Sequence, residues 1–138
     1  MTKRMLVGFV AGFVAVLVFH QGVLWILHHL GYVPNAPWPM KPVPPFGIPA
    51  VISLAFWGGV WGAIMMPLID RRRGAAFWIA AIVFGAIVPT LAAWFIVAPL
   101  KHMPIAGGWK PKTMMIGPIV NGAWGLGTAL VYRLFIKR

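Results

Sequence analysis

Four polar side chains that could take part in chemistry lie within long apolar runs of the sequence: His20, Gln21, Thr90 and Asn121. His20 and Thr90 each stand about 15 residues after the start of such a run, and Asn121 stands about seven residues into another. In helices that rise 1.5 Å per residue and alternate in direction, these side chains reach a similar depth. We therefore expect them to form one polar layer.

This polar layer has two interpretations, and the sequence leaves both open. Imidazole and amide groups in apolar surroundings can bind a small ligand or carry a proton. The same groups often join neighbouring helices, by hydrogen bonds worth roughly 0.6 kcal/mol and seldom more than about 1.7 kcal/mol. The layer is thus the candidate ligand-binding site, with helix packing as its alternative role.

A second group of potential ligands consists of His28, His29 and His102, which stand near the ends of apolar runs. Histidine can bind copper or the iron of haem. Adjacent residues on a helix point about 100° apart, however, and the sequence contains no two histidines four residues apart. We expect no metal or cofactor here and keep haem or copper as a weaker alternative.

Acidic residues and cysteines are nearly absent from the chain. Asp70 is the one acidic residue, and there is no cysteine. Glycoside hydrolysis needs a pair of carboxylates, a serine–histidine–aspartate triad needs one beside its histidine, and thiol chemistry needs cysteine. Cation-coupled transport usually depends on a carboxylate inside the membrane. We therefore expect a protein that is not an enzyme.

The elements that must position the polar layer are four apolar runs. The chain has 138 residues, of which 61% are hydrophobic and 9% are charged, and its mean hydropathy is +0.87. A hydrocarbon layer about 30 Å thick requires about 20 helical residues, because the backbone must satisfy its own hydrogen bonds there. We predict spans over about residues 5–30, 47–69, 75–100 and 114–136.

These runs predict an all-α integral membrane protein, a single domain over residues 1–138 built as an up-down bundle of four transmembrane helices. The loops over residues 31–46 and 101–113 share one side and are rich in proline and tryptophan. Such segments are stiff and suit the membrane surface. We expect them to be interfacial connectors, with a lid over an outward-facing pocket as the alternative.

Two sequence patterns concern how the spans pack. Small residues four apart form one helix face at Gly8 and Gly12, at Gly58 and Gly62, and at Ala123 and Gly127, as in close helix crossings. Displacing the sequence by 69 residues also aligns similar residues, among them Trp25 with Trp94. This second pattern favours, weakly, a tandem repeat of two parallel hairpins.

The basic residues predict the orientation. Eight lysines and arginines stand at the chain ends and in the turn after the second span, and four stand in the outer loops. The positive-inside rule then places both termini in the cytoplasm, in a multi-pass protein of the cell inner membrane. Asp70 is expected in a tight, charged turn. Five basic side chains are expected to contact lipid headgroups: Arg71, Arg72, Arg73, Lys137 and Arg138.

The net charge of +11 is better explained by this distribution than by nucleic-acid binding. Because no catalytic set of residues is evident, we expect a non-catalytic accessory or assembly subunit of a larger membrane complex or a homo-oligomer. The alternative is a passive channel or binding protein for a small neutral or anionic molecule. The four lysines of the outer loops favour anions at an outward-facing polar site.

Overall fold

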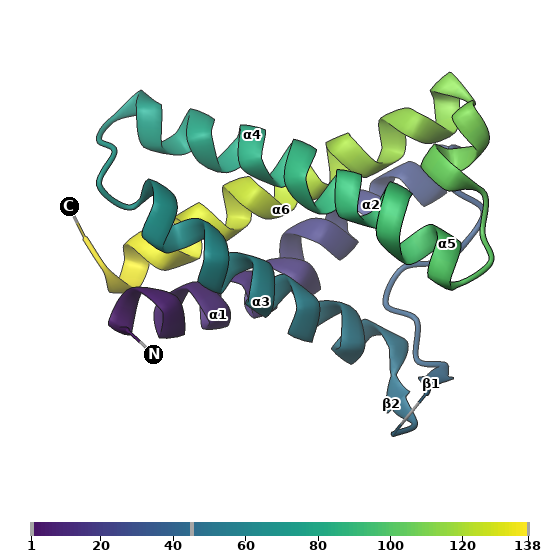
Figure 1. Ribbon diagram of the computed structural model, residues 1–138, viewed down its shortest axis with the longest axis horizontal. Coiled ribbons are helices and arrows are strands. Elements are labelled where there is room, and N and C mark those ends of the chain that lie inside the picture. Colours follow the sequence, from purple (N-terminus) through teal and green to yellow (C-terminus); the bar gives the residue numbers. More distant parts are fainter. Residues whose placement is uncertain (1, 45, 138) are drawn as a thin grey trace.

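The structure, a computed structural model, describes residues 2–44 and 46–137. Four helices in it are long and apolar enough to cross a membrane (Figure 1), which confirms the predicted number of spans. The elements are α1 (Lys3–Ala15), η1 (Val16–His20) and α2 (Gln21–His29) in the first span; α3 (Ala50–Ile69) in the second; α4 (Ala75–Ala92), η2 (Ala93–Val97) and α5 (Ala98–Leu100) in the third; and α6 (Pro111–Phe135) in the fourth. The observed ends differ from the predicted ends by at most three residues.

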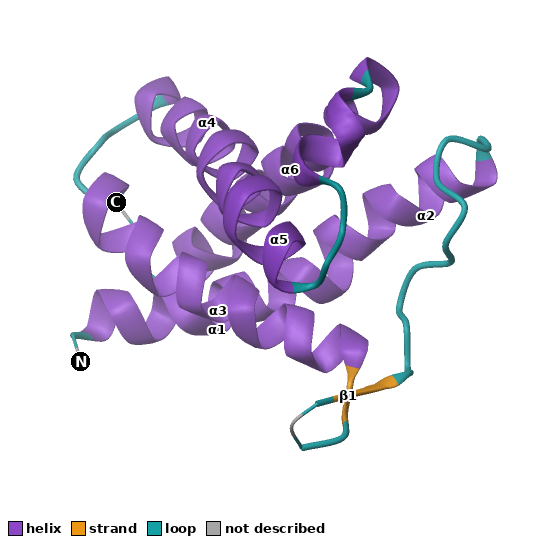
Figure 2. Ribbon diagram, turned by 45° about the vertical axis from the view of Figure 1, so that its right-hand side comes forward, coloured by secondary structure: helices purple, strands orange, loops and turns teal. Residues whose placement is uncertain are grey.

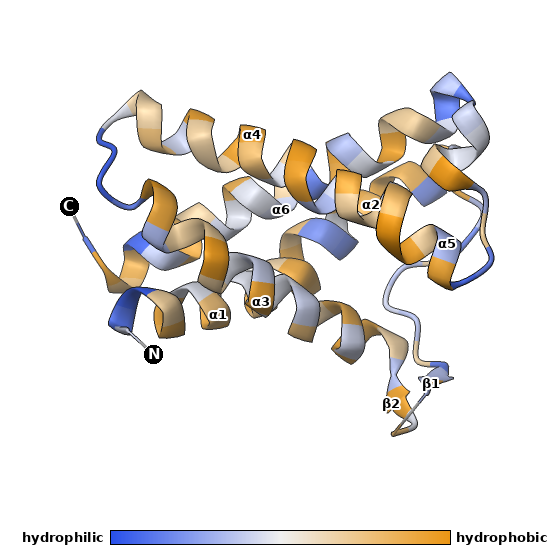
Figure 3. Ribbon diagram, in the orientation of Figure 1, coloured by the Kyte–Doolittle hydropathy of each residue, from blue (hydrophilic) through white to orange (hydrophobic). Residues whose placement is uncertain are grey.

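Large apolar side chains cover the outside of the bundle. In Figure 3, hydrophobic colour runs along most of α3 and α4, whereas hydrophilic colour marks the chain ends and the turn between these two helices. Leu68 of α3 and Ile96 of η2 expose 61% and 59% of their surface. In water such a surface would be unfavourable, but lipid tails are as apolar as leucine.

Glycines let the first two spans cross at close range. A Cβ atom added to Gly12 would overlap the carbonyl oxygen of Gly58, and one added to Gly62 would overlap that of Gly8. Two of the predicted small-residue faces therefore pack against each other, as the backbones of α1 and α3. In lipid this close contact supplies the dispersion attraction that burial of leucine does not.

The last two spans cross in a similar way. Gly85 of α4 faces the carbonyl of Asn121, and Gly125 of α6 faces that of Ala81. The predicted face with Gly127 packs elsewhere: Gly127 receives the ring of Phe19 from the first span, whereas the crossing with α4 uses Gly125.

The two crossings do not follow the displacement of 69 residues. The places of Gly8 and Gly12 in the first crossing are taken in the second by Ala81 and Gly85 of α4, which stand 73 residues later in the chain. The places of Gly58 and Gly62 are taken by Asn121 and Gly125 of α6, which stand 63 residues later. The two crossings pack in the same way, but no single displacement of the sequence relates their residues. The tandem repeat therefore gains no support from the way the helices pack.

The four spans form two pairs that spread apart. α1 packs on α3, α4 packs on α6, and the pairs meet chiefly where α1 contacts α6, while α3 and α4 touch little. Figures 1 and 2 show α3 and α4 joined by a short turn at one end of the bundle. This arrangement leaves a side of the bundle open between α3 and α4.

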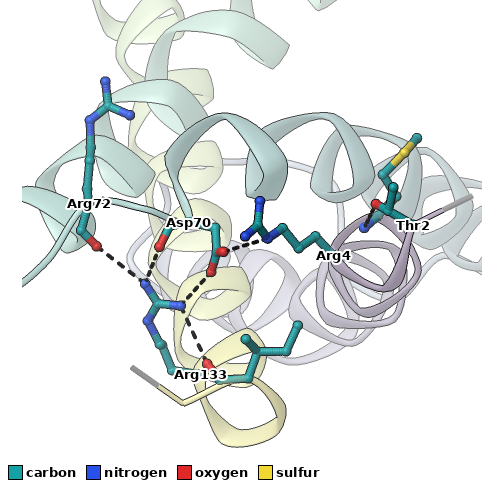
Figure 4. Close-up of polar contacts among 7 residues, drawn as sticks. Thr2, Arg4, Asp70, Arg72 and Arg133 are labelled. Atoms are coloured by element: carbon teal, nitrogen blue, oxygen red, sulfur yellow. Dashed lines mark hydrogen bonds and ion pairs between the residues drawn. The ribbon is translucent and has the colours of Figure 1, made fainter.

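Asp70 ties together the end of the bundle at which both termini lie (Figure 4). Its carboxylate is fully buried and lies 2.9 Å from Arg4 Nε and 2.9 Å from Arg133 Nη1. Arg133 Nη2 also donates to the Asp70 carbonyl at 3.0 Å, and the guanidinium lies 3.6 Å from the centre of the Phe77 ring. The turn is tight, as expected, but Asp70 points into the bundle and joins α1, α3 and α6.

The loops over residues 31–46 and 101–113, which we call the outer loops after their predicted side of the membrane, contain or adjoin short regular elements that were not predicted. Strands β1 (Pro42–Val43) and β2 (Ile48–Pro49) pair antiparallel just before α3, and the 3₁₀ segment η3 (Ile105–Trp109) precedes α6. Lys112 Nζ, at the start of α6, lies 5.5 Å from the centre of the Tyr32 ring, so the first of these loops approaches the start of α6. Left-handed backbone at Trp38 and Trp109 gives both loops specific, strained folds.

Candidate functional site

A change of helix type places His20 and Gln21. Over η1 the backbone adopts π-helical bonding, and the Gln21 N–H donates to Val16 O, five residues back. Such bulges often occur at functional sites, because the extra residue turns neighbouring side chains and carbonyls out of the usual pattern. His20 ends η1 and Gln21 begins α2, and their side chains are joined by a 2.9 Å hydrogen bond between Nε2 of Gln21 and Nδ1 of His20.

Thr90 and Asn121 come to the same site from the second helix pair. Asn121 Nδ2 donates to Thr90 Oγ1 at 2.9 Å, and Thr90 is almost fully buried. His20 and Asn121 line the same cavity. The structure therefore brings together all four residues of the predicted polar layer, as two hydrogen-bonded pairs, Gln21 with His20 and Asn121 with Thr90, that meet at this cavity.

Two hydrogen bonds fix the orientation of the Gln21 amide and the protonation of the His20 ring. The Trp38 backbone N–H donates to Gln21 Oε1 at 2.7 Å, so the other end of that amide, Nε2, is the donor to His20 Nδ1. An imidazole whose Nδ1 accepts carries its proton on Nε2. His20 therefore carries its donor at Nε2.

A cavity of about 210 Å³ lies against His20 and Asn121, between α3 and α4. Its walls are otherwise mainly apolar: Val16, Leu54, Trp57, Gly58, Trp61, Pro89, Ala93 and Trp124. Leu54 and Trp57 are 42% and 58% exposed, so the cavity opens on the lipid-facing side of the bundle. The three tryptophans were not predicted as site residues, because nothing in the sequence shows that Trp124 of α6 faces the same space as Trp57 and Trp61 of α3.

Trp38 binds to the polar layer from the first outer loop. Besides its backbone bond to Gln21, its indole Nε1–H donates to Leu17 O at 2.9 Å, a carbonyl within the π-helical segment. Its φ of +52° is unusual for a bulky residue. The loop is therefore held against α2 by specific bonds rather than lying free at the surface.

Replacing Trp38 with phenylalanine is expected to loosen this loop, because an aromatic ring is kept and the bond to Leu17 O is lost. The backbone N–H of residue 38, which is bonded to Gln21, should then exchange its hydrogen several-fold faster, since a bond worth roughly 1 kcal/mol shifts a local opening about fivefold. Hydrogen exchange read by mass spectrometry measures this rate. Trp109→Phe is the matched control, because that indole is 63% exposed in the other outer loop. Equal exchange at residue 38 in both variants would contradict the role of the Leu17 bond.

The other predicted ligands lie away from this cavity. His28 Nδ1 bonds Val33 O at 2.9 Å, His29 Nδ1 bonds Trp25 O at 3.0 Å, and His102 is exposed in the second outer loop. Over residues 2–44 and 46–137, no three histidine or acidic side chains gather as a metal site would require. Within that part of the chain, the His28 and His29 rings are 5.8 Å apart and nearly perpendicular.

The predicted headgroup contacts lie at the end of the bundle where Asp70 is buried. Arg71, Arg72, Arg73 and Lys137 are exposed there, and Arg138 lies outside the described residues.

Comparison with protein-family models, curated protein sequences and solved structures returns no match to this chain. The function must therefore be argued from the geometry of the site.

Proposed function

We propose that this protein is a non-catalytic binding subunit of the cell inner membrane, which takes up a small apolar molecule through the cavity between α3 and α4. The observation that carries the proposal is a pair of hydrogen-bonding side chains, His20 and Asn121, at a cavity that opens toward lipid. A binding role rather than a catalytic one is supported by the single carboxylate side chain, which is buried against two arginines far from this cavity.

The hydrogen bonds favour a ligand with an acceptor oxygen. Gln21 occupies His20 Nδ1, so the group of His20 that can turn to a ligand is the Nε2–H donor beside Asn121. The Asn121 amide itself donates from Nδ2 to Thr90 Oγ1. A carbonyl or an anionic oxygen can accept the bond from His20 Nε2, whereas a cation cannot. Apolar walls around one or two polar groups are typical of small-molecule sites. We therefore favour a neutral or anionic molecule with an apolar body.

The sideways opening also favours binding over conduction. A passive channel would need a path between the two membrane surfaces, whereas Leu54 and Trp57 lead from this cavity into the lipid. Trp38 and its bonds to Gln21 and Leu17 cover the layer from the outer loop. The ligand would thus enter from the bilayer.

An accessory or assembly subunit is the second candidate, and the same opening supports it. Histidine and asparagine often bond across helices in membranes, so a helix of a partner chain or a second copy could fill the space. The α4 wall extends only from Pro89 to Ala93, about one helical turn. So short a wall favours a small molecule over a whole helix.

The orientation is part of the proposal. Arg4, Asp70 and Arg133 join the start of α1, the end of α3 and the end of α6, so the basic segments share one end of the bundle. By the positive-inside rule we place this end, with both termini, in the cytoplasm. The cavity then lies nearer the outer side.

Photocrosslinking separates the two candidates. A benzophenone amino acid at Trp57, on the rim of the cavity, is expected to capture a small apolar molecule in intact membranes, identified by the mass of the adduct. His20→Ala should reduce this adduct about tenfold, because one hydrogen bond of about 1.4 kcal/mol is lost. The control places the same probe at Leu68, which is 61% exposed on α3 and outside the cavity.

Each result assigns a different role. Capture of a protein at Trp57 but not at Leu68 would favour the accessory subunit. Identical lipid adducts at both positions, unaffected by His20→Ala, would show contact with bulk lipid only and would contradict the binding role.

A further inference from the structure

We propose that a pocket at the end of the bundle near Asp70 binds the phosphate group of an anionic phospholipid. This basic pocket, of about 590 Å³, is lined by Arg72, Arg73, Phe77, Trp78, Arg133 and Lys137. It is separate from the cavity between α3 and α4 and does not depend on the function proposed for that cavity. The inference distinguishes a specific site from general attraction between basic residues and the membrane surface.

Two distant parts of the chain build the basic pocket. Arg72 and Arg73 belong to the turn between α3 and α4, whereas Arg133 and Lys137 come from the end of α6. The bonds of Arg133 to Asp70 and to the carbonyl of Arg72, the latter at 3.5 Å, hold the two parts together. The cations are thus gathered by the tertiary fold.

The basic pocket has an excess of positive charge. Asp70 is the only acidic residue of the chain, and its two oxygens accept from Arg4 and Arg133. No second carboxylate side chain exists to pair with Arg72, Arg73 or Lys137. Figure 4 shows the Arg72 side chain extending away from Asp70, and its Nη1 donates to Leu68 O at 2.9 Å. These cations can therefore bind an external anion.

The start of α4 adds a second attraction for an anion. Gly74, which also lines the basic pocket, precedes the helix with φ +59°, and no side chain caps the first turn. The N–H groups of a first helical turn have no partner within the helix, and the helix dipole makes this end positive. Phosphate groups bind such helix starts readily, particularly beside arginines.

Apolar neighbours indicate that the phosphate belongs to a lipid. Phe77 and Trp78 line the basic pocket, and Leu134 and Phe135, next to Arg133, are 66% and 63% exposed. Tryptophan at this level of a membrane protein usually lies among the headgroups. Inorganic phosphate would make no use of these apolar groups, whereas a phospholipid would place its glycerol and acyl chains against them.

Native mass spectrometry of the full chain in mild detergent tests the proposal. With equal amounts of phosphatidylglycerol and phosphatidylcholine added, we expect phosphatidylglycerol to be retained at least several-fold more. Arg73→Gln with Lys137→Gln should abolish that preference. The control, Lys3→Gln with Arg71→Gln, removes the same charge from exposed residues at the same end of the bundle that do not line the basic pocket. It should keep most of the preference.

Three results would overturn the proposal. The first is equal retention of the two lipids by the unchanged protein. The second is an equal loss of preference in both double variants, which would indicate general surface attraction. The third is displacement of phosphatidylglycerol by inorganic phosphate at similar concentration, which would assign the site to a soluble anion.

Two further measurements serve as controls. Thermal unfolding of each variant confirms that it is folded, and the charge-conserving double variant Arg73→Lys with Lys137→Arg should keep the preference for phosphatidylglycerol.

Discussion

Replacing Asp70 with asparagine is expected to lower the free energy of unfolding by about 3–5 kcal/mol, because it leaves a buried arginine without its counter-charge. The Asp70 side chain is fully buried, and that of Arg133 is only 14% exposed. An amide can still accept one hydrogen bond, but it cannot balance two guanidinium groups. The measurement is the loss of helical signal on titrating the purified protein with a denaturing detergent.

The two arginines should differ in their importance. The Arg4 side chain is 36% exposed, so water and headgroups can replace much of what Asp70 provides, and Arg4→Gln should be clearly milder than Asp70→Asn. Arg71→Gln is the control, because Arg71 is exposed in the same turn, and it should leave the transition unchanged within about 0.5 kcal/mol.

Removing both members of the buried pair checks the mechanism. Asp70→Asn combined with Arg133→Leu takes away the unpaired charge, so stability should recover relative to Asp70→Asn alone. A loss in the double variant equal to the sum of the two single losses would show that the residues act independently. It would also refute the description of Asp70 as the residue that joins α1, α3 and α6.

The features that the sequence predicted correctly depend on local physics. A long apolar run must become a helix in lipid, because its peptide groups have no other hydrogen-bond partners there. The four spans followed from this rule alone. Residue depth along a helix is also local. The residue counts that placed His20 and Thr90 at one level therefore anticipated a real proximity, because Asn121 bonds Thr90 and lines one cavity with His20.

The features that could not be predicted depend on pairing between distant segments. Nothing near Asp70 in the sequence indicates that its partners are Arg4 and Arg133, since three closer arginines follow it directly. The bond from Trp38 to Leu17 O needs a π-helical segment, for which the apolar sequence VLVFH gives no signal. The existence of the cavity likewise depends on the distance between α3 and α4, which are packed on different partner helices.

The buried charge and the cavity belong to one architecture. The turn after Asp70 joins α3 to α4 at one end, and the bonds to Arg4 and Arg133 fix that end to α1 and α6. Beyond this turn α3 packs mainly on α1 and α4 packs mainly on α6, so α3 and α4 touch each other little. The glycine crossings therefore determine how wide the cavity beside His20 can be.

Gly125→Ala is accordingly expected to destabilise the protein by about 3 kcal/mol, near the upper end of the usual range for overpacking. The added methyl group would overlap the Ala81 carbonyl and approach the backbone of Gly85, and a backbone cannot move aside as a side chain can. The helices would have to separate, losing dispersion contacts along the crossing of α4 and α6. Denaturation in detergent measures the loss.

Gly122→Ala provides the matched control, because it makes the same change on the same helix. There the nearest atom to the added methyl group is Ala86 Cβ at 3.6 Å, an ordinary contact, so stability should stay the same or rise slightly with the better helix propensity of alanine. Gly12→Ala and Gly22→Ala form a second pair in the first span, since Gly12 faces the carbonyl of Gly58 whereas Gly22 has open space around it. If both members of each pair had the same effect, close backbone crossing would not be what holds these helices together.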